Sequence, residues 1–236
     1  MAEVHLARSL EVQEAFRGRL GKVHPQHPHL AAIDVRIEDA RARLASDGSP
    51  LARNFTSGAL KDIKRAHGVV FDPFETSLAG LRVAKRPLWI SYEGEEFMNL
   101  VSRPTQVAIF PHRKDFYVPE SNNLSLPDQG QLLEVDLEEV IKKKWGVGGM
   151  DFAIGDVATH AALPFAYLER PESKGVRLHG RDYDYKFART DTPTVGSRVA
   201  SVGYFFDRRG LYVRDWRAGD GYGNVWAVRL GVPAQE

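Results

Sequence analysis

A histidine and two aspartates come close together in the stretch RLHGRDYDYKF. His179, Asp182 and Asp184 are residue types that transfer protons in general acid–base catalysis, and the same types also bind metal ions. A plain structural interpretation competes with this one. Asp182 and Asp184 lie two positions apart and would share the solvated face of a strand, with Tyr183 and Tyr185 on the other face. The plain interpretation is the stronger of the two, and the stretch implies neither a metal nor a cofactor.

A second candidate site is rich in Tyr, Trp and Arg, the residue types that most often contribute binding energy at protein interfaces. Residues 201–224 include three Tyr, two Phe, one Trp, four Arg and three Asp, with five Gly among them. So many aromatic and charged side chains cannot all enter a core, and exposed aromatic residues indicate a ligand site. The residues that we expect to form one exposed, contiguous ligand-binding face are Tyr204, Phe206, Asp207, Arg208, Arg209, Tyr212, Arg214, Asp215, Arg217, Asp220, Tyr222 and Asn224.

Other residues in the same region should form the framework under this face. In VWAVRLGV, alternation places Trp226, Val228 and Leu230 on one side, as in a buried last strand. In GLYVRDW, Leu211, Val213 or Trp216 should anchor the turn. We expect these side chains to be buried, and they include both tryptophans of the region. The framework residues are Val202, Val213, Trp216, Trp226, Val228 and Leu230.

The C-terminal region also lacks four residue types. Lys, Glu, Gln and Met together make up 34 of the 236 residues, yet none of them occurs in the 48 positions from 187 to 234. Strands and turns naturally favour aromatic, β-branched and glycine residues, so a structural explanation exists. Composition alone does not separate this explanation from a functional one.

The overall composition excludes several classes of protein. The net charge is +1, which argues against a nucleic-acid-binding protein, because such proteins usually carry a marked basic excess. The absence of cysteine excludes disulfides, thiolate nucleophiles and cysteine-based zinc sites. No apolar run is long enough for a signal peptide or a membrane span. We therefore expect a cytoplasmic location by default, with the virion or the cell surface as the alternative destinations.

The element pattern predicts an α+β fold that follows an N-terminal helical segment of residues 1–70. Helices are expected near residues 9–20, 29–45 and 57–67, and β-rich runs begin at about Val69. A helix should run from near Pro127 to Gly146, and another should follow Asp156 and be disturbed at Pro164. Strands and turns occupy the chain after Pro171, so residues 71–236 form a mixed α and β domain.

The stretch SRVASVGYFFDRRGLYVRDWRAGDGYGNVWAVRLGV resembles the C-terminal end of domains with the C-type lectin fold, of the formylglycine-generating-enzyme type. It is more specifically similar to the variable proteins of diversity-generating retroelements. The resemblance implies a C-type lectin-like domain over residues 71–236, with a variable region at about 198–226. It covers residues 185–232 well, while residues 1–70 match nothing in that family.

The resemblance also supplies a cause for the missing residue types. In that family, diversification rewrites adenines, typically in Asn codons of a template. Changes in the first two bases of AAC or AAT produce Tyr, Asp, Ser, Gly, Arg and others, but never Lys, Glu, Gln, Met or Trp. Trp216 and Trp226 would then be fixed framework residues.

The hypothesis that follows is a non-enzymatic binding protein whose diversified C-terminal face recognises a macromolecular or cell-surface ligand. Oxidase activity of the fold is not carried over, because it uses cysteines and this chain has none. The sugar- and calcium-binding motifs of animal lectins, Glu-Pro-Asn and Trp-Asn-Asp, are also absent. The alternative hypothesis is a small metal-independent hydrolase or lyase that uses His179, Asp182 and Asp184.

Overall fold

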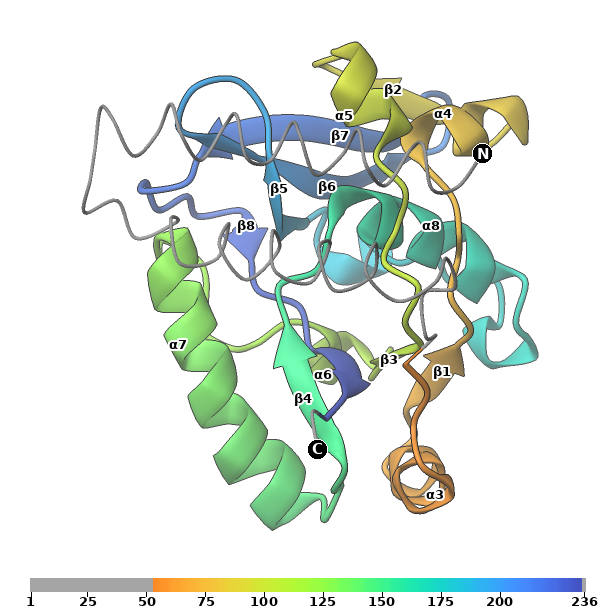
Figure 1. The fold of residues 1–236 in the computed structure, drawn as a ribbon, viewed down its shortest axis with the longest axis vertical. Helices are drawn as coiled ribbons and strands as arrows, with labels where there is room; N and C mark the ends of the chain where they lie inside the picture. The colour runs from red at the N-terminus through yellow and green to blue at the C-terminus, as the bar shows by residue number, and fades with distance from the viewer. Residues whose placement is uncertain (1–52, 235–236) are drawn as a thin grey trace, which may run out of the picture. The chain divides into compact units, whose positions relative to one another are not determined.

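Two β-sheets with a helix between them organise the part of the chain described by the computed structural model, residues 53–234. The expected α+β class is confirmed (Figure 1). The helices expected near residues 9–20 and 29–45 lie outside the described residues.

The first sheet has four strands in the order β1-β3-β9-β4. These strands are β1 (Val69–Phe71), β3 (Val107–Ile109), β4 (Met150–Ala153) and β9 (Leu230–Pro233). All of its pairs are antiparallel. The last strand of the chain therefore lies between two strands that come much earlier in the sequence.

The second sheet has five strands in the order β2-β7-β6-β5-β8. Its centre is antiparallel and consists of β5 (Phe187–Pro193), β6 (Arg198–Phe206) and β7 (Gly210–Arg217). The edge strands β2 (Leu88–Ile90) and β8 (Val225–Trp226) are parallel to their neighbours. The predicted last strand is thus divided, since β8 belongs to this sheet and β9 to the other.

Polar side chains begin the main helices at the expected places. The Thr56, Ser125 and Asp156 side chains accept hydrogen bonds from backbone N–H groups three residues later, which satisfies donors that the first helical turn leaves free. The helices are α3 (Ser57–Arg65), α7 (Leu126–Asp136), its π-helical continuation η1 (Leu137–Lys144) and α8 (Val157–Leu168).

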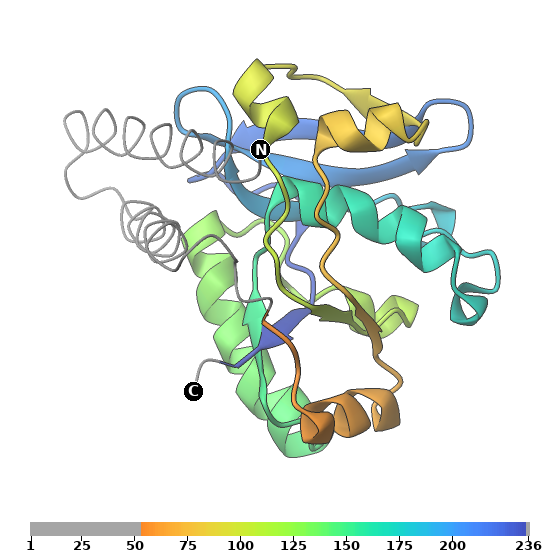
Figure 2. The same ribbon diagram turned by 45° about the vertical axis from the view of Figure 1, so that its right-hand side comes forward.

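Helix α8 lies between the two sheets (Figures 1 and 2). Its Val157, Ala161 and Phe165 pack against residues of β6 and β7. Its Leu163 and Tyr167 pack into a cluster that includes strands of the four-stranded sheet. The helix continues through Pro164, so the predicted disturbance there is not observed. This double packing makes α8 the support for one face of the five-stranded sheet.

Short helices complete the described region. They are α4 (Leu78–Val83), α5 (Glu95–Asn99) and α6 (Arg113–Phe116), with 3-10 turns η2 (Pro171–Ser173) and η3 (Arg181–Tyr183). Two predictions were wrong here. The sequence pattern of EFMNLVSR, residues 96–103, predicts a β-rich run, but its first four residues belong to α5. The stretch with Asp182 and Asp184 was expected to be a strand, but it forms η3 and the turn that follows.

The packing also moves the expected domain boundary at residue 71. Phe55, Ala59 and Ile63 are buried together with Phe110 and Ile141 in one hydrophobic cluster. Helix α3 therefore belongs to the same compact unit as the residues that follow it. A boundary between residues 70 and 71 would separate side chains that share a core.

Candidate functional site

The face of the five-stranded sheet opposite α8 carries a layer of aromatic rings. Phe187, which is 2 % exposed, lies at its centre. Tyr204 stacks on the Phe187 ring at a centroid distance of 4.8 Å, and Trp216 meets the ring edge-on at 5.0 Å. The residues of this layer come from the sheet and its adjoining loops. We call them the aromatic face: Trp89, Tyr185, Phe187, Tyr204, Phe206, Arg209, Tyr212, Arg214, Trp216 and Tyr222.

Strand alternation and one bulge build the aromatic face. In β7, Leu211 and Val213 point toward α8, so Tyr212 and Arg214 point the other way. In β6 the register shifts between Gly203 and Phe205, and the intervening Tyr204 adopts a positive φ of 53°. A bulge of this kind re-aims a side chain, and here the Tyr204 ring is directed onto Phe187.

A glycine allows β6 and β5 to approach each other below these rings. A Cβ atom at Gly203 would lie 2.3 Å from the Lys186 carbonyl oxygen and 2.5 Å from the Phe187 Cα atom. Both neighbours are backbone atoms, so they cannot move aside as a flexible side chain could. The close approach therefore requires glycine at this position.

Two arginines lie on the rings of the aromatic face. Trp89 and Tyr212 are stacked, with centroids 4.1 Å apart and an interplanar angle of 11°. The Arg209 guanidinium carbon lies 4.6 Å from the Trp89 ring centre, and that of Arg214 lies 3.8 Å from the Trp216 ring centre. Guanidinium groups on aromatic faces are attracted by the ring quadrupole. The side chains therefore form one continuous row in the order Arg209, Trp89, Tyr212, Arg214 and Trp216.

Fewer than half of the twelve residues expected to be exposed are so in the structure. Asp207, Arg208, Arg209, Arg217 and Asp220 are exposed, and the other seven are half-buried. Whether they bind a ligand stays a prediction. Six of them contact rings of the aromatic face: Tyr204, Phe206, Arg209, Tyr212, Arg214 and Tyr222.

The expectation of one contiguous face is wrong for several of the others. Asp207 pairs at 2.8 Å with Arg177, whose guanidinium lies over a ring on the α8 side of the sheet. Asp215 pairs at 3.3 Å with Arg198, and alternation places Asp215 and Arg217 on the same side as the core residue Val213. The expectation failed because it treated exposed residues as if they shared one side of the hairpin.

The predicted framework is largely confirmed. Five of its six residues, including Trp216, are buried. Trp226 is only half-buried, because its indole packs at the edge of a cluster and the Lys186 amino group lies 3.8 Å from its ring centre. Trp226 was expected to be largely buried, and the structure corrects that expectation.

A buried arginine holds the loop that follows β7. Arg189 of β5 is 1 % exposed, and its guanidinium donates to four backbone carbonyl oxygens and to no carboxylate. The shortest of these bonds is 3.0 Å, to the Asp220 carbonyl oxygen. Burial lowers the pKa of Arg189 to about 10. The acceptors belong to Leu124, Arg217, Ala218 and Asp220.

Further hydrogen bonds hold the same loop through its backbone. The buried Gln129 amide donates to the Val225 carbonyl oxygen at 3.2 Å. The Asn123 N–H donates to the Tyr222 carbonyl oxygen at 3.0 Å, and the Leu126 N–H donates to that of Ala218 at 2.9 Å. All three donors lie outside residues 198–226. The conformation of the loop therefore depends on its backbone and on these neighbours more than on its own side chains.

The structure separates the three residues of the alternative acid–base site. His179 is fully buried, and its Nδ1 atom is hydrogen bonded to Tyr117 Oη at 2.6 Å. Burial lowers the pKa of His179 to about 3, so the imidazole is neutral at physiological pH. Asp182 and Asp184 are exposed, and Asp184 pairs with Arg113. No described contact joins the imidazole to either carboxylate.

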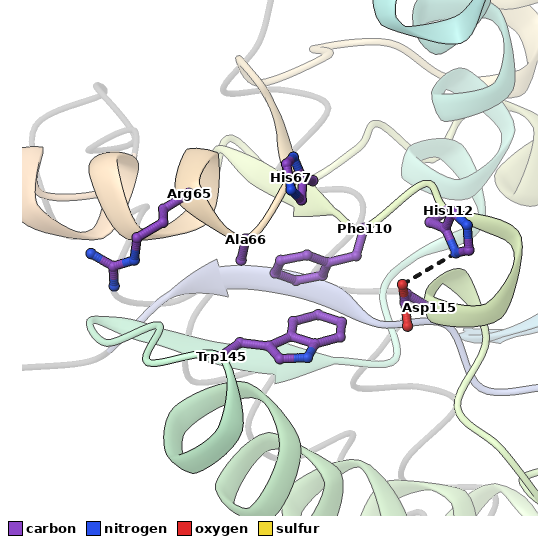
Figure 3. A pocket seen from close by; sticks show the side chains of 7 residues that line it. All are labelled: Arg65, Ala66, His67, Phe110, His112, Asp115 and Trp145. Atoms are coloured by element: carbon purple, nitrogen blue, oxygen red, sulfur yellow. Dashed lines mark ion pairs between the residues drawn. The ribbon is translucent and has the colours of Figure 1, made fainter.

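A hollow of about 460 Å³ lies elsewhere, where α3, β3, α6 and η1 end (Figure 3). Phe110 and Trp145 form an aromatic wall with ring centres 5.0 Å apart. Most of the ionisable side chains that line the hollow form ion pairs with nearby residues. His112 Nδ1 lies 3.3 Å from an Asp115 carboxylate oxygen, and Arg65 pairs with Asp62 at 2.9 Å.

Sequence reasoning missed Trp89, Arg189 and Gln129. Trp89 lies in RPLWISYEG, and its partner Tyr212 is more than a hundred positions away, so local patterning gives no signal for the contact. The signal for Arg189 is a charged residue within a strand whose neighbours are apolar or small. Such a residue needs buried acceptors if the strand is central.

Comparisons of the chain with family models, with curated proteins and with solved structures return no match. Among residues 53–234, no group of three or more His, Cys, Asp or Glu is arranged to hold a metal ion. None of the helices in that part of the chain is long and apolar enough to cross a membrane.

Proposed function

We propose that the protein is a non-enzymatic binding protein, a variable protein of a diversity-generating retroelement with a C-type lectin-like fold. Its ligand-binding surface is the aromatic face together with the loop of residues 217–224. The ligand is a macromolecular surface, and the protein acts by recognition without chemistry. The fold assignment is supported by the α+β architecture and by the hairpin β6–β7, which precedes the final strand.

The way the 217–224 loop is held carries this proposal. A display protein must keep one backbone conformation while its exposed side chains change. Arg189 binds carbonyl oxygens of the loop, and Gln129 binds that of Val225 directly after it. Every residue type provides a carbonyl oxygen, so these hydrogen bonds survive replacement of the loop side chains. A loop fixed in advance also loses less entropy when a ligand docks.

The hairpin has the same division between support and surface. Val202, Leu211 and Val213 pack toward α8 and are buried. Tyr212 lies between Leu211 and Val213 in β7, Arg214 follows Val213, and both remain half-buried on the aromatic face. Tyr, Trp and Arg in such positions are the residue types that dominate binding energy at interfaces. The surface can therefore vary without removing the core residues that support it.

The genomic neighbourhood tests this proposal directly. We expect a second copy of the segment that encodes residues 198–226, differing only where that copy has adenines, beside a gene for a reverse transcriptase. A neighbourhood that contains neither a second copy nor a reverse transcriptase gene would overturn the proposal.

A further inference from the structure

Four arginines of the β6–β7 hairpin form no ion pair among the described residues, whereas eight other arginines of that region do. Arg65, Arg82, Arg86, Arg103, Arg113, Arg177, Arg198 and Arg229 all form ion pairs. Among the described residues, Arg209 and Arg214 form none, although both lie on the aromatic face. Arg208 at the turn and Arg217 at the end of β7 also lack an ion pair within residues 53–234.

The acidic residues of the same hairpin are already engaged elsewhere. Asp207 pairs with Arg177, and Asp215 pairs with Arg198. Neither carboxylate therefore neutralises the arginines on the aromatic face. The aromatic face carries uncompensated positive charge although the whole chain has a net charge of only +1.

Stacking on the rings restricts the orientation of the Arg209 and Arg214 guanidinium groups. A guanidinium that lies over an indole keeps the N–H groups of its planar edge available, and that edge matches the two oxygens of a carboxylate. Stacking also reduces the side-chain freedom that binding would otherwise remove. Arg209 on Trp89 and Arg214 on Trp216 are both arranged in this way.

The geometry points to a protein surface rich in Asp and Glu as the partner of the aromatic face, with the edges of Arg209 and Arg214 each binding a carboxylate. This inference rests on the proposed function and names the chemistry of its ligand. A single-stranded nucleic acid fits less well, because the ring surfaces that bases would stack on are occupied. Trp89 is covered by Tyr212 on one side and by Arg209, and Trp216 is covered by Arg214.

A binding assay with defined probes tests the inference. The full chain is passed over sensor surfaces that carry peptides of repeating Glu-Gly, Gln-Gly or Lys-Gly, and over one that carries single-stranded oligothymidylate. We expect binding to the Glu-Gly surface alone, with an affinity that falls as salt is added, because the contact is between exposed charges. The double variant Arg209→Gln and Arg214→Gln should bind roughly tenfold more weakly or worse.

A matched variant controls for net charge. Lys61→Gln with Lys64→Gln removes the same two charges from α3, which packs with β1 and η1, outside the five-stranded sheet (Figures 1 and 2). Its affinity should stay within about twofold of the unaltered protein, because exposed charges that far away are screened. Arg209→Lys with Arg214→Lys keeps the charge but loses the planar edge, and it should recover only a small part of the affinity. Circular dichroism spectra check whether each variant remains folded.

Several outcomes would overturn the inference. They are equal binding to the Gln-Gly surface, tighter binding to oligothymidylate, or equal losses in the two glutamine variants. Full recovery of the affinity in the variant with both arginines replaced by lysine would show that binding does not need the planar guanidinium edge. The genomic test is independent of this assay. If a second gene copy is found but the protein does not bind the Glu-Gly surface, only the acidic-partner inference is overturned. If the protein binds the Glu-Gly surface but no second copy is found, only the proposed class of protein is overturned.

Discussion

The Arg189 guanidinium donates to the backbone carbonyl oxygen of Asp220 at 3.0 Å, and not to the Asp220 carboxylate. The acidic side chain is exposed while the arginine is 1 % exposed. The hydrogen bond from this strand residue to the loop therefore does not use the Asp220 side chain. Burial lowers the pKa of Arg189, and the Tyr222 and Asp220 side chains act against that shift without a hydrogen bond to Arg189.

This relationship predicts effects of very different size on the free energy of unfolding for two substitutions. Arg189→Met leaves four carbonyl oxygens without their donor in a buried place, and it should lower the free energy of unfolding by about 3 kcal/mol or more. Asp220→Ala keeps the carbonyl oxygen and should change the free energy of unfolding by less than about 0.5 kcal/mol. Urea denaturation measures both. A loss for Asp220→Ala as large as that for Arg189→Met would contradict the backbone-only role.

Two glycines near the site should differ sharply in their tolerance of alanine. Gly203→Ala places a methyl group against the Lys186 and Phe187 backbone and should cost about 1–3 kcal/mol, because the strands must separate. At Gly219 nothing lies within 4 Å of the added atom, so Gly219→Ala should stay within about 0.5 kcal/mol. Thermal melting of the two variants side by side checks this, and equal melting temperatures would contradict it.

Residues on the surface should divide into those that cover Phe187 and those that do not. Tyr204→Ser uncovers the Phe187 ring, with which Tyr204 stacks at 4.8 Å, and should lower the free energy of unfolding by about 1–2 kcal/mol. Arg208→Ser removes an exposed side chain at the turn and should be nearly neutral, within about 0.5 kcal/mol. Chemical denaturation distinguishes the two, and a neutral Tyr204→Ser would show that the ring is not part of the packing.

Two buried histidines should make the fold sensitive to mild acid. Burial lowers the pKa of His179 from 6.5 to about 3 and also lowers the pKa of His160. Below pH 6.5 the unfolded chain takes up protons that the folded chain does not. The stability that the neutral His179 contributes is therefore full above about pH 6.5 and falls as the pH decreases toward about 3, by up to about 1.4 kcal/mol per pH unit. His160 changes the stability in the same direction.

The urea midpoint measured between pH 7 and pH 5 checks this prediction, because most carboxylates do not titrate in that range. A urea midpoint that stays constant over this range would mean that the two imidazoles are not held neutral in the folded state.

Local signals were sufficient for the parts of the fold that local physics determines. The Asp156 cap and the apolar run after it predicted α8, and the apolar character of Leu211, Val213 and Trp216 predicted their burial in β7. The turn at residues 180–185 was missed because Asp184 and Tyr185 adopt positive φ values, which the sequence gives no reason to expect of these residues. Helix α5 was missed because five residues are too few to show a period.

The candidate site was predictable only in its composition. The Tyr- and Arg-rich tract is visible in the sequence, but the side of the sheet on which each residue lies depends on the bulge at Tyr204. Trp89 and Arg189 reach the site through strand pairings and loop contacts between distant segments. Contacts of that kind are determined by the tertiary fold, and the residues next to them in the sequence show no pattern that predicts them.

The central position of β9 in the four-stranded sheet has a consequence for copying errors. Strands β3 and β4 reach each other only through β9, which is translated after the whole of residues 198–226. A stop codon or a shift of reading frame in that tract would remove β9 and leave both neighbours with unpaired edges. We expect such chains to be degraded. Only gene copies that preserve the reading frame to the end would therefore yield a folded protein.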